Sequence, residues 1–152
     1  MIEQAAAIPM DSGRICLVNS SSGRGWVIPK GRIEPGDTAR DTAAKEAWEE
    51  AGVVGVLHEK PIGAYLYEKN GASYHVVVYA MEVTEVATAW PEDHRRIRRW
   101  IDPDKIDRFI QVTGMRRVLR RVRELMAVAP THGRFDQAVA VDEPFFATLP
   151  GQ

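Results

Sequence analysis

Residues 31–53 read GRIEPGDTARDTAAKEAWEEAGV, a glycine-rich loop followed by an acidic segment with helical character. Thr38 followed by Asp41 resembles a capping box, which predicts that a helix begins at about Ala39. Gly52 predicts the end of this helix, because glycine readily adopts the left-handed conformation that closes a helix.

Three glutamates stand out within the predicted helix. Glu46, Glu49 and Glu50 share one helix face, because neighbours at i+3 and i+4 lie within about 100° of one another. Like charges at this spacing oppose a helix by a few tenths of a kcal/mol per pair, so the cluster needs a compensating partner. A divalent cation is one such partner, since Mg²⁺ prefers carboxylate oxygens together with waters and substrate phosphates. The alternative is a solvated acidic helix face.

The surroundings of the cluster favour the metal interpretation. The loop before the helix carries Lys30 and Arg32, and its glycine backbone can approach an anion closely. Acids, glycines and bases in one segment suit a metal-bridged pyrophosphate. We expect the side of the helix opposite the glutamates to be buried, through Ala44, Ala47, Trp48 and Ala51.

This segment resembles the signature of the Nudix hydrolases. That signature reads Gly, five residues, Glu, seven residues, Arg-Glu, an aliphatic residue, any residue, Glu-Glu, any residue, Gly and an aliphatic residue. All 23 positions are in register, with matches at Gly31, Glu46, Glu49-Glu50, Gly52 and Val53. Three positions depart from it, namely Asp37 for Glu, Lys45 for Arg and Ala47 for a larger aliphatic residue.

The resemblance implies a catalytic role for the Asp37 and Lys45 positions. In the family, the signature Glu and Arg form an ion pair that orients the catalytic helix. Asp37 and Lys45 keep the charge signs, so we expect them to pair. Lysine lacks the bidentate fork of arginine, so the helix would be held less rigidly and activity would be weakened rather than lost.

The resemblance also implies a metal site and a general base. Glu46 and Glu50 would bind Mg²⁺, or Mn²⁺ in its place, together with the backbone carbonyl of Lys30. Glu49 would activate water or act as a further ligand. The family often adds an acid from a later loop, for which Glu92 and Asp93 are candidates, with surface solubility as the alternative.

The rest of the chain predicts an α/β fold. Strands are expected at 5–10, 14–20, 62–68, 73–83 and 96–101, with a short apolar stretch at 26–28, a loop at 30–36 and helices near 103–110 and 115–127. The Asn70-Gly71 turn predicts a hairpin. The resemblance implies a Nudix-type α/β/α sandwich with a mixed β-sheet, one catalytic helix and C-terminal helices. We expect a Nudix hydrolase domain at 1–128 and an irregular tail at 129–152, which would cover an edge strand or join a second subunit in a homodimer.

The charge distribution bears on the substrate. Residues 94–123 hold 11 of the 20 Lys and Arg with three acids, a balance of +8, against −9 elsewhere. Together with WVIPKG, EEAGVVG, VTEV and the Arg-rich strand ending at Trp100, this is similar to the diphosphoinositol polyphosphate phosphohydrolase branch, which also cleaves diadenosine polyphosphates. We expect Arg96 and Arg98 to face the substrate while Ile97 faces a core. The remaining candidate phosphate contacts are Lys30, Gly31, Arg32 and Arg116, the last with a solvated helix face as its alternative.

The predicted function is Mg²⁺-dependent cleavage of a pyrophosphate bond in a polyphosphorylated small molecule. One alternative is a nucleotide- or phosphate-sensing module with little catalysis, and another is an RNA-end pyrophosphohydrolase. A sequence pI of about 6.4 counts against nucleic acid as a partner. Tyr65 and Tyr67 are interpreted as packing residues, with a nucleobase slot as the alternative.

Composition sets the remaining expectations. The 152 residues are 45% hydrophobic and 27% charged, which is typical of an ordinary globular domain. The chain has no apolar run near the roughly 20 residues that a membrane span needs. It also lacks a recognisable signal peptide, so we expect a cytoplasmic protein. Cys16 is the lone cysteine and is expected to be a buried strand residue.

Overall fold

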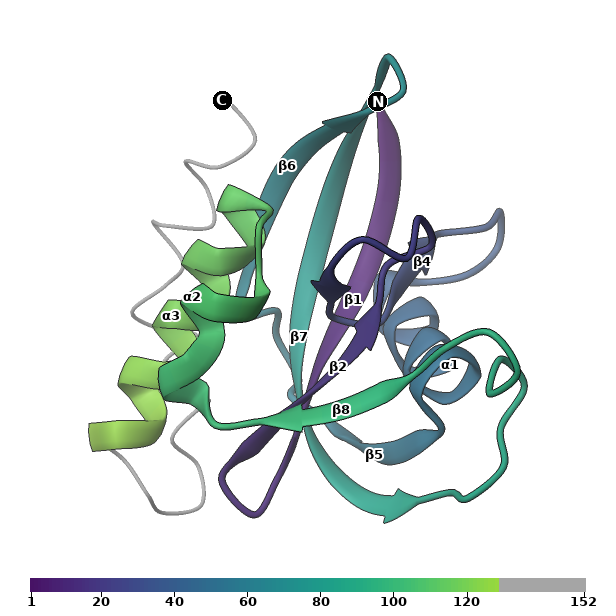
Figure 1. The fold of residues 1–152 in the computed structure, drawn as a ribbon. Helices are drawn as coiled ribbons and strands as arrows, with labels where there is room; N and C mark the ends of the chain where they lie inside the picture. The colour runs from purple at the N-terminus through teal and green to yellow at the C-terminus, as the bar shows by residue number, and fades with distance from the viewer. Residues whose placement is uncertain (129–152) are drawn as a thin grey trace.

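The computed structural model describes residues 1–128, which form one mixed sheet of eight strands with helices on both faces (Figure 1). The strands are β1 (Ile2–Asp11), β2 (Arg14–Asn19), β3 (Trp26–Val27), β4 (Lys30–Arg32), β5 (Val53–Leu57), β6 (Gly63–Lys69), β7 (Ala72–Val86) and β8 (Arg98–Ile101). The helices are α1 (Ala39–Ala51), the 3₁₀ turn η1 (Pro103–Lys105), α2 (Ile106–Phe109) and α3 (Thr113–Val128). None of these helices is long and apolar enough to cross a bilayer.

Strands β1 and β7 form the centre of the sheet. They run parallel from the pair Ile2 and Tyr74 to the pair Met10 and Glu82. The other pairings are antiparallel: β4 and β2 share the free side of β1, while β6 and β5 share the free side of β7. Each central strand therefore pairs with two different strands along its outer edge, and β4 lies beside the start of β1.

Alternation along the central strands separates two cores. On β1, Ala6, Ile8 and Met10 pack in the core that also contains residues of α2 and α3, whereas Ala5 and Ala7 pack with α1. Because successive strand residues point to opposite faces, a single apolar strand supplies both layers. The predicted α/β/α sandwich with a mixed sheet is thus confirmed (Figure 1).

Helix α1 has the predicted ends. The Thr38 side chain accepts a hydrogen bond from the Asp41 N–H at 3.0 Å, and Gly52 ends the helix with φ 65°. The predicted buried face is partly wrong, because Ala44 is exposed and Trp48 is 38% exposed. The helix instead packs on the sheet through a stripe at i, i+4 and i+8, with Glu50 turned inward beside it: Ala43, Ala47, Ala51. Methyl side chains let the helix lie close to the sheet, and a Trp in that stripe would hold it away.

Some expected boundaries differ from the structure. The predicted loop at 30–36 contains β4, and β5 was not predicted, since it is an edge strand whose Val56 is 62% exposed. Ile97 was expected in the core but is 64% exposed. The chain turns before β8, where the Glu92 carbonyl accepts the N–H groups of Arg95 and Arg96, so strand alternation begins only at Arg98. The predicted tail, 129–152, lies outside the described residues.

Candidate active site

Two glutamates of α1 turn toward the sheet rather than into solvent. The side chain of Glu50 is 8% exposed, and its Oε1 accepts the backbone N–H of Lys30 at 3.2 Å. Glu46 lies against Gly31, where a Cβ atom would come within 2.3 Å of the Glu46 carboxyl carbon. The glycine of β4 therefore leaves the space that the Glu46 carboxyl group occupies.

Burial disfavours the ionised form of both glutamates. Burial, followed by the neighbouring charge of Glu50, raises the pKa of Glu46 to about 8. Burial also raises the pKa of Glu50, although the Arg96 guanidinium partly offsets this. A bound cation would relieve both costs, because it favours the ionised forms.

The donor chemistry fits a magnesium ion that keeps part of its water shell. Within residues 1–128, no three His, Cys, Asp or Glu side chains converge as a ready ligand set. Glu46 and Glu50 are nevertheless neighbours, and the Lys30 backbone lies beside them. One or two carboxylates, completed by waters and substrate phosphates, is the usual protein environment of Mg²⁺.

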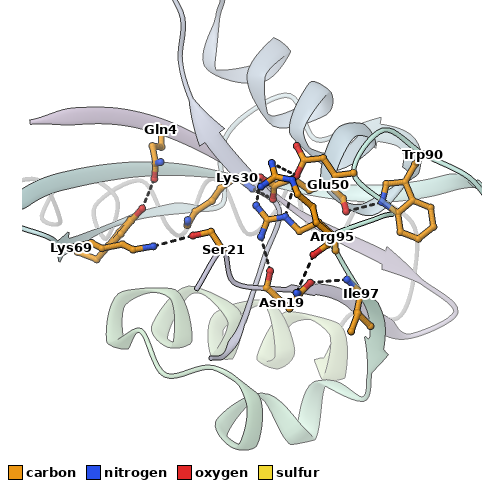
Figure 2. A network of polar contacts seen from close by, with 12 residues as sticks. Gln4, Asn19, Ser21, Lys30, Glu50, Lys69, Trp90, Arg95 and Ile97 are labelled. Carbon is orange, nitrogen blue, oxygen red and sulfur yellow. Dashed lines mark hydrogen bonds and ion pairs between the residues drawn. The ribbon is translucent and has the colours of Figure 1, made fainter. Parts of the chain in front are cut away.

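Arg96 connects α1 to two loops. Its guanidinium donates to Glu92 Oε1 at 3.1 Å, to the Asn19 carbonyl at 2.7 Å and to Glu50 Oε2 at 3.4 Å. Asn19 in turn accepts the Ile97 N–H through its side chain at 2.7 Å (Figure 2). With a side chain only 10% exposed, Arg96 is the principal counter-ion of Glu50.

A cavity of about 500 Å³ opens beside this pair. Its walls come from strands β1, β3 and β4, from helix α1, from the loop after β2, from the β6–β7 hairpin, from the segment before β8 and from the start of α3. The lining residues are Gln4, Ser20, Ser21, Val27, Lys30, Glu50, Tyr67, Glu68, Lys69, Asn70, Tyr74, Arg96, Val112 and Met115. Burial lowers the pKa of Lys30, whose Nζ lies 5.2 Å from the centre of the Tyr67 ring. A neighbouring hollow of about 260 Å³ shares Ser20, Ser21 and Arg96 with the first.

The structure brings only some of the predicted site residues together. Lys30, Glu50 and Arg96 line the cavity, whereas Glu46, which neighbours Glu50, and Gly31, which lies against Glu46, are not among its lining residues. Glu49 is half-buried, and it is close enough to Glu46 to raise the pKa of that group.

Three of the predicted phosphate contacts, namely Arg32, Arg98 and Arg116, do not line this cavity, whereas Arg96 does. Arg98, the first residue of β8, donates to the Ala51 carbonyl at 2.9 Å, at the end of α1. Arg116 donates to the Ile110 carbonyl at 2.7 Å and so joins α2 to α3. Arg32 is exposed at the end of β4.

The expected pair of Asp37 and Lys45 does not form. Both side chains are exposed, and no ion pair joins them in the described part of the chain. The Asp37 N–H instead bonds to the Glu34 carbonyl, which places Asp37 in a turn of the loop. Of the candidate loop acids, Glu92 bonds to Arg95 and Arg96, whereas Asp93 accepts the Trp90 N–H.

Sequence reasoning did not single out Gln4, Ser21 or Lys69 as wall residues, and it named Tyr67 for a nucleobase slot only as the alternative to packing. Tyr67 hydrogen-bonds Gln4 at 2.8 Å and stacks on Tyr74 with ring centres 4.7 Å apart, while Lys69 donates to Ser21 at 3.1 Å. These contacts depend on which strands are paired, and no local motif encodes them. Tyr65, by contrast, is 1% exposed and belongs to the core, so it cannot form a base slot.

Comparison with known proteins identifies the family. The sequence model of the NUDIX domain matches residues 2–122, so the chain belongs to the Nudix family, enzymes that act on phosphoanhydride bonds. It is 32% identical over 118 residues to Nudix hydrolase 4 of Arabidopsis thaliana, covering 76% of this chain and 56% of that protein. It is 34% identical over 87 residues to diphosphoinositol polyphosphate phosphohydrolase 2 of Rattus norvegicus, covering 57% and 46%. The chain thus spans about half the length of these relatives.

Solved structures agree on the fold. A NUDIX hydrolase from Nitrosomonas europaea superimposes with a TM-score of 0.70 at 18% identity, covering 81% of this chain and 88% of that one. The C. elegans Ap4A hydrolase in a binary complex gives a TM-score of 0.66 at 19% identity, covering 84% and 98%. At this identity the likeness supports the architecture alone.

Proposed function

We propose that this chain is a Mg²⁺-dependent hydrolase that cleaves a pyrophosphate bond in a polyphosphorylated small molecule, either a diphosphoinositol polyphosphate or a dinucleoside polyphosphate. One observation carries the proposal. Glu50 of α1, with Glu46 as its side-chain neighbour, borders a cavity whose other walls carry the cations Lys30, Lys69 and Arg96. Acids for a metal and bases for phosphates therefore meet at one place.

The size of the site supports a long phosphate-bearing substrate. Two adjoining hollows of about 500 and 260 Å³ share Arg96, and the smaller one is lined by the serines of the loop after β2. Arginine and hydroxyl groups are good partners for phosphate oxygens. The names of two similar proteins, a diphosphoinositol polyphosphate phosphohydrolase and an Ap4A hydrolase, agree with such a substrate.

The residues divide the chemistry among them. Glu46, Glu50 and the Lys30 carbonyl would hold Mg²⁺, or Mn²⁺ in its place. When bound, the cation neutralises phosphate oxygens and acidifies a water molecule. Glu49 then accepts the proton of the attacking water. Arg96 and the Lys30 ammonium group steady the phosphate that leaves.

A phosphate-release screen tests the proposal. The panel contains inositol pyrophosphates, dinucleoside polyphosphates, nucleoside triphosphates and sugar nucleotides, each with and without Mg²⁺. Glu49→Gln is expected to lower kcat by about 10²–10⁴-fold, the usual contribution of a general base. Glu59→Gln, at an exposed glutamate outside the site, is the matched control and is expected to behave as wild type. Full turnover by Glu49→Gln would contradict the assigned role.

A second candidate function is phosphate sensing with little catalysis. The observation that favours it is the unpaired state of Asp37 and Lys45, which leaves α1 without the ion pair that the family signature provides. Calorimetric binding of a panel compound without Mg²⁺-dependent turnover would support this function over hydrolysis.

The cytoplasmic location stays a prediction, and the names of several Arabidopsis relatives include the word mitochondrial.

A further inference from the structure

We propose that Trp90 and Arg98 are positioning residues that fix the acidic face of α1 by binding the carbonyl groups at its C-terminal end. This inference rests on the proposed function, because it concerns Glu49 and Glu50 of the same site. Neither residue lines the cavity, so their effect would be exerted through the helix.

The end of α1 is held by one later segment of the chain. The last carbonyl groups of a helix have no partner within the helix itself. Here the Glu49 carbonyl accepts the Glu92 N–H at 3.0 Å, and the Glu50 carbonyl accepts the Trp90 indole N–H at 3.0 Å (Figure 2). The Ala51 carbonyl accepts the Arg98 guanidinium at 2.9 Å. Three residues between 90 and 98 therefore bind the carbonyl groups of the last three residues of α1, two of which are the glutamates Glu49 and Glu50.

Electrostatics adds to these hydrogen bonds. Helix α1 has no basic residue in its last turn, where a cation would favourably meet the negative end of the helix dipole. Arg98 supplies that charge from β8, and its guanidinium lies 4.3 Å from the centre of the Trp90 ring. The two side chains thus act as one unit against the helix end.

Gly52 leaves the space that the Trp90 ring needs to contact the end of α1. Gly52 follows the helix directly, and a Cβ there would lie 2.7 Å from the Trp90 ring. The indole can therefore approach the backbone closely enough to reach the Glu50 carbonyl. Because the side chains of Glu49 and Glu50 project from the same residues whose carbonyls are held, a small shift of this last turn would move both carboxyl groups.

Removing the Trp90 or Arg98 hydrogen bonds to α1 is therefore expected to change the metal affinity of the site. Groups that orient metal ligands typically change affinity or activity by 10–100-fold when they are removed. Trp90→Phe keeps an aromatic ring but loses the N–H donor together with the second ring of the indole. Arg98→Lys keeps the charge and loses the planar guanidinium. Arg99→Lys is the matched control, since Arg99 lies next to Arg98 but packs over Trp26 and Phe109, away from α1.

Electron paramagnetic resonance of free Mn²⁺, with the protein in excess and no substrate, tests the proposal directly. Trp90→Phe and Arg98→Lys are each expected to weaken Mn²⁺ binding by about tenfold. With the substrate identified by the screen, kcat is expected to fall while KM stays near the wild-type value. Arg99→Lys is expected to bind Mn²⁺ as the wild type does. Thermal unfolding confirms that each variant is folded at the assay temperature.

The outcomes separate this inference from the function on which it rests. Absence of both Mn²⁺ binding and hydrolysis in the wild-type chain would overturn the proposed function and the inference together. Wild-type Mn²⁺ binding with unchanged affinity in both variants, even with a lowered melting temperature, would overturn the inference alone, since the two residues would then serve stability only.

Discussion

A substitution at Gly31 is expected to lower the activity of the protein while leaving its free energy of unfolding nearly unchanged. Substituting Gly31→Ala places a Cβ 2.3 Å from the Glu46 carboxyl carbon and 2.5 Å from its Oε1, whereas ordinary contacts begin at 3.4 Å. Gly31 has no positive φ, so the backbone of β4 accepts alanine without strain. The conflict is resolved by the Glu46 side chain, whose far end must retreat by about 1 Å.

The size of the expected rate loss follows from the displacement of the Glu46 carboxyl group. A misplacement of about 1 Å in catalytic geometry can cost about 10²-fold in rate, which corresponds to about 2.7 kcal/mol in the activation free energy. The free energy of unfolding is expected to change by less than about 1 kcal/mol, because Gly→Ala at a compatible site slightly favours the folded state. The variant is therefore expected to be folded and nearly inactive, with a raised Mg²⁺ requirement.

The assay compares kcat/KM over a Mg²⁺ titration with urea unfolding of the same preparation. Gly25→Ala is the matched control, since a Cβ at Gly25 meets nothing within 4 Å and that residue also has no positive φ. Gly31→Ala with wild-type kcat/KM at every Mg²⁺ concentration would refute the placement of Glu46 as a metal ligand. A large loss of stability would show instead that the Glu46 carboxyl group cannot move.

Three further predictions concern stability and reactivity. Gly52→Ala is expected to lower the free energy of unfolding by about 2 kcal/mol, because it combines a φ of 65° with a close Trp90 ring; a urea midpoint equal to wild type would contradict this. Arg96→Met leaves Glu50 buried without its cation, so urea unfolding should show a loss of about 3 kcal/mol, and a loss below about 1 kcal/mol would argue against a buried pair. Burial raises the pKa of Cys16 to about 12, despite the opposing charge of a nearby arginine. At pH 8 the native thiol is therefore protonated and should resist Ellman's reagent until denaturant is added; rapid labelling of the native protein would contradict its burial.

The sequence alone determined those features that depend on near neighbours. Thr38 and Gly52 end α1 through contacts within a few residues, so their chemistry predicted both ends correctly. The apolar runs within β1 and β7 predicted these strands for a similarly local reason, whereas the α/β/α sandwich was implied by the resemblance to the Nudix signature. The spacing of Glu46, Glu49 and Glu50 placed the acids on one part of the helix for the same local reason.

The tertiary structure decided everything that joins distant segments. Sequence spacing placed Trp48 on the buried face of the helix and Ile97 toward a core. In the structure a stripe of alanines packs α1 on the sheet, and the chain turns at residues 92–96 before β8 begins. Arg96 and Arg98 are two residues apart, yet one meets the Glu50 carboxyl group and the other the Ala51 carbonyl. Pairings of this kind lie 46 or 47 residues apart in the chain, so they depend on strand order and packing, which no short pattern of residues specifies.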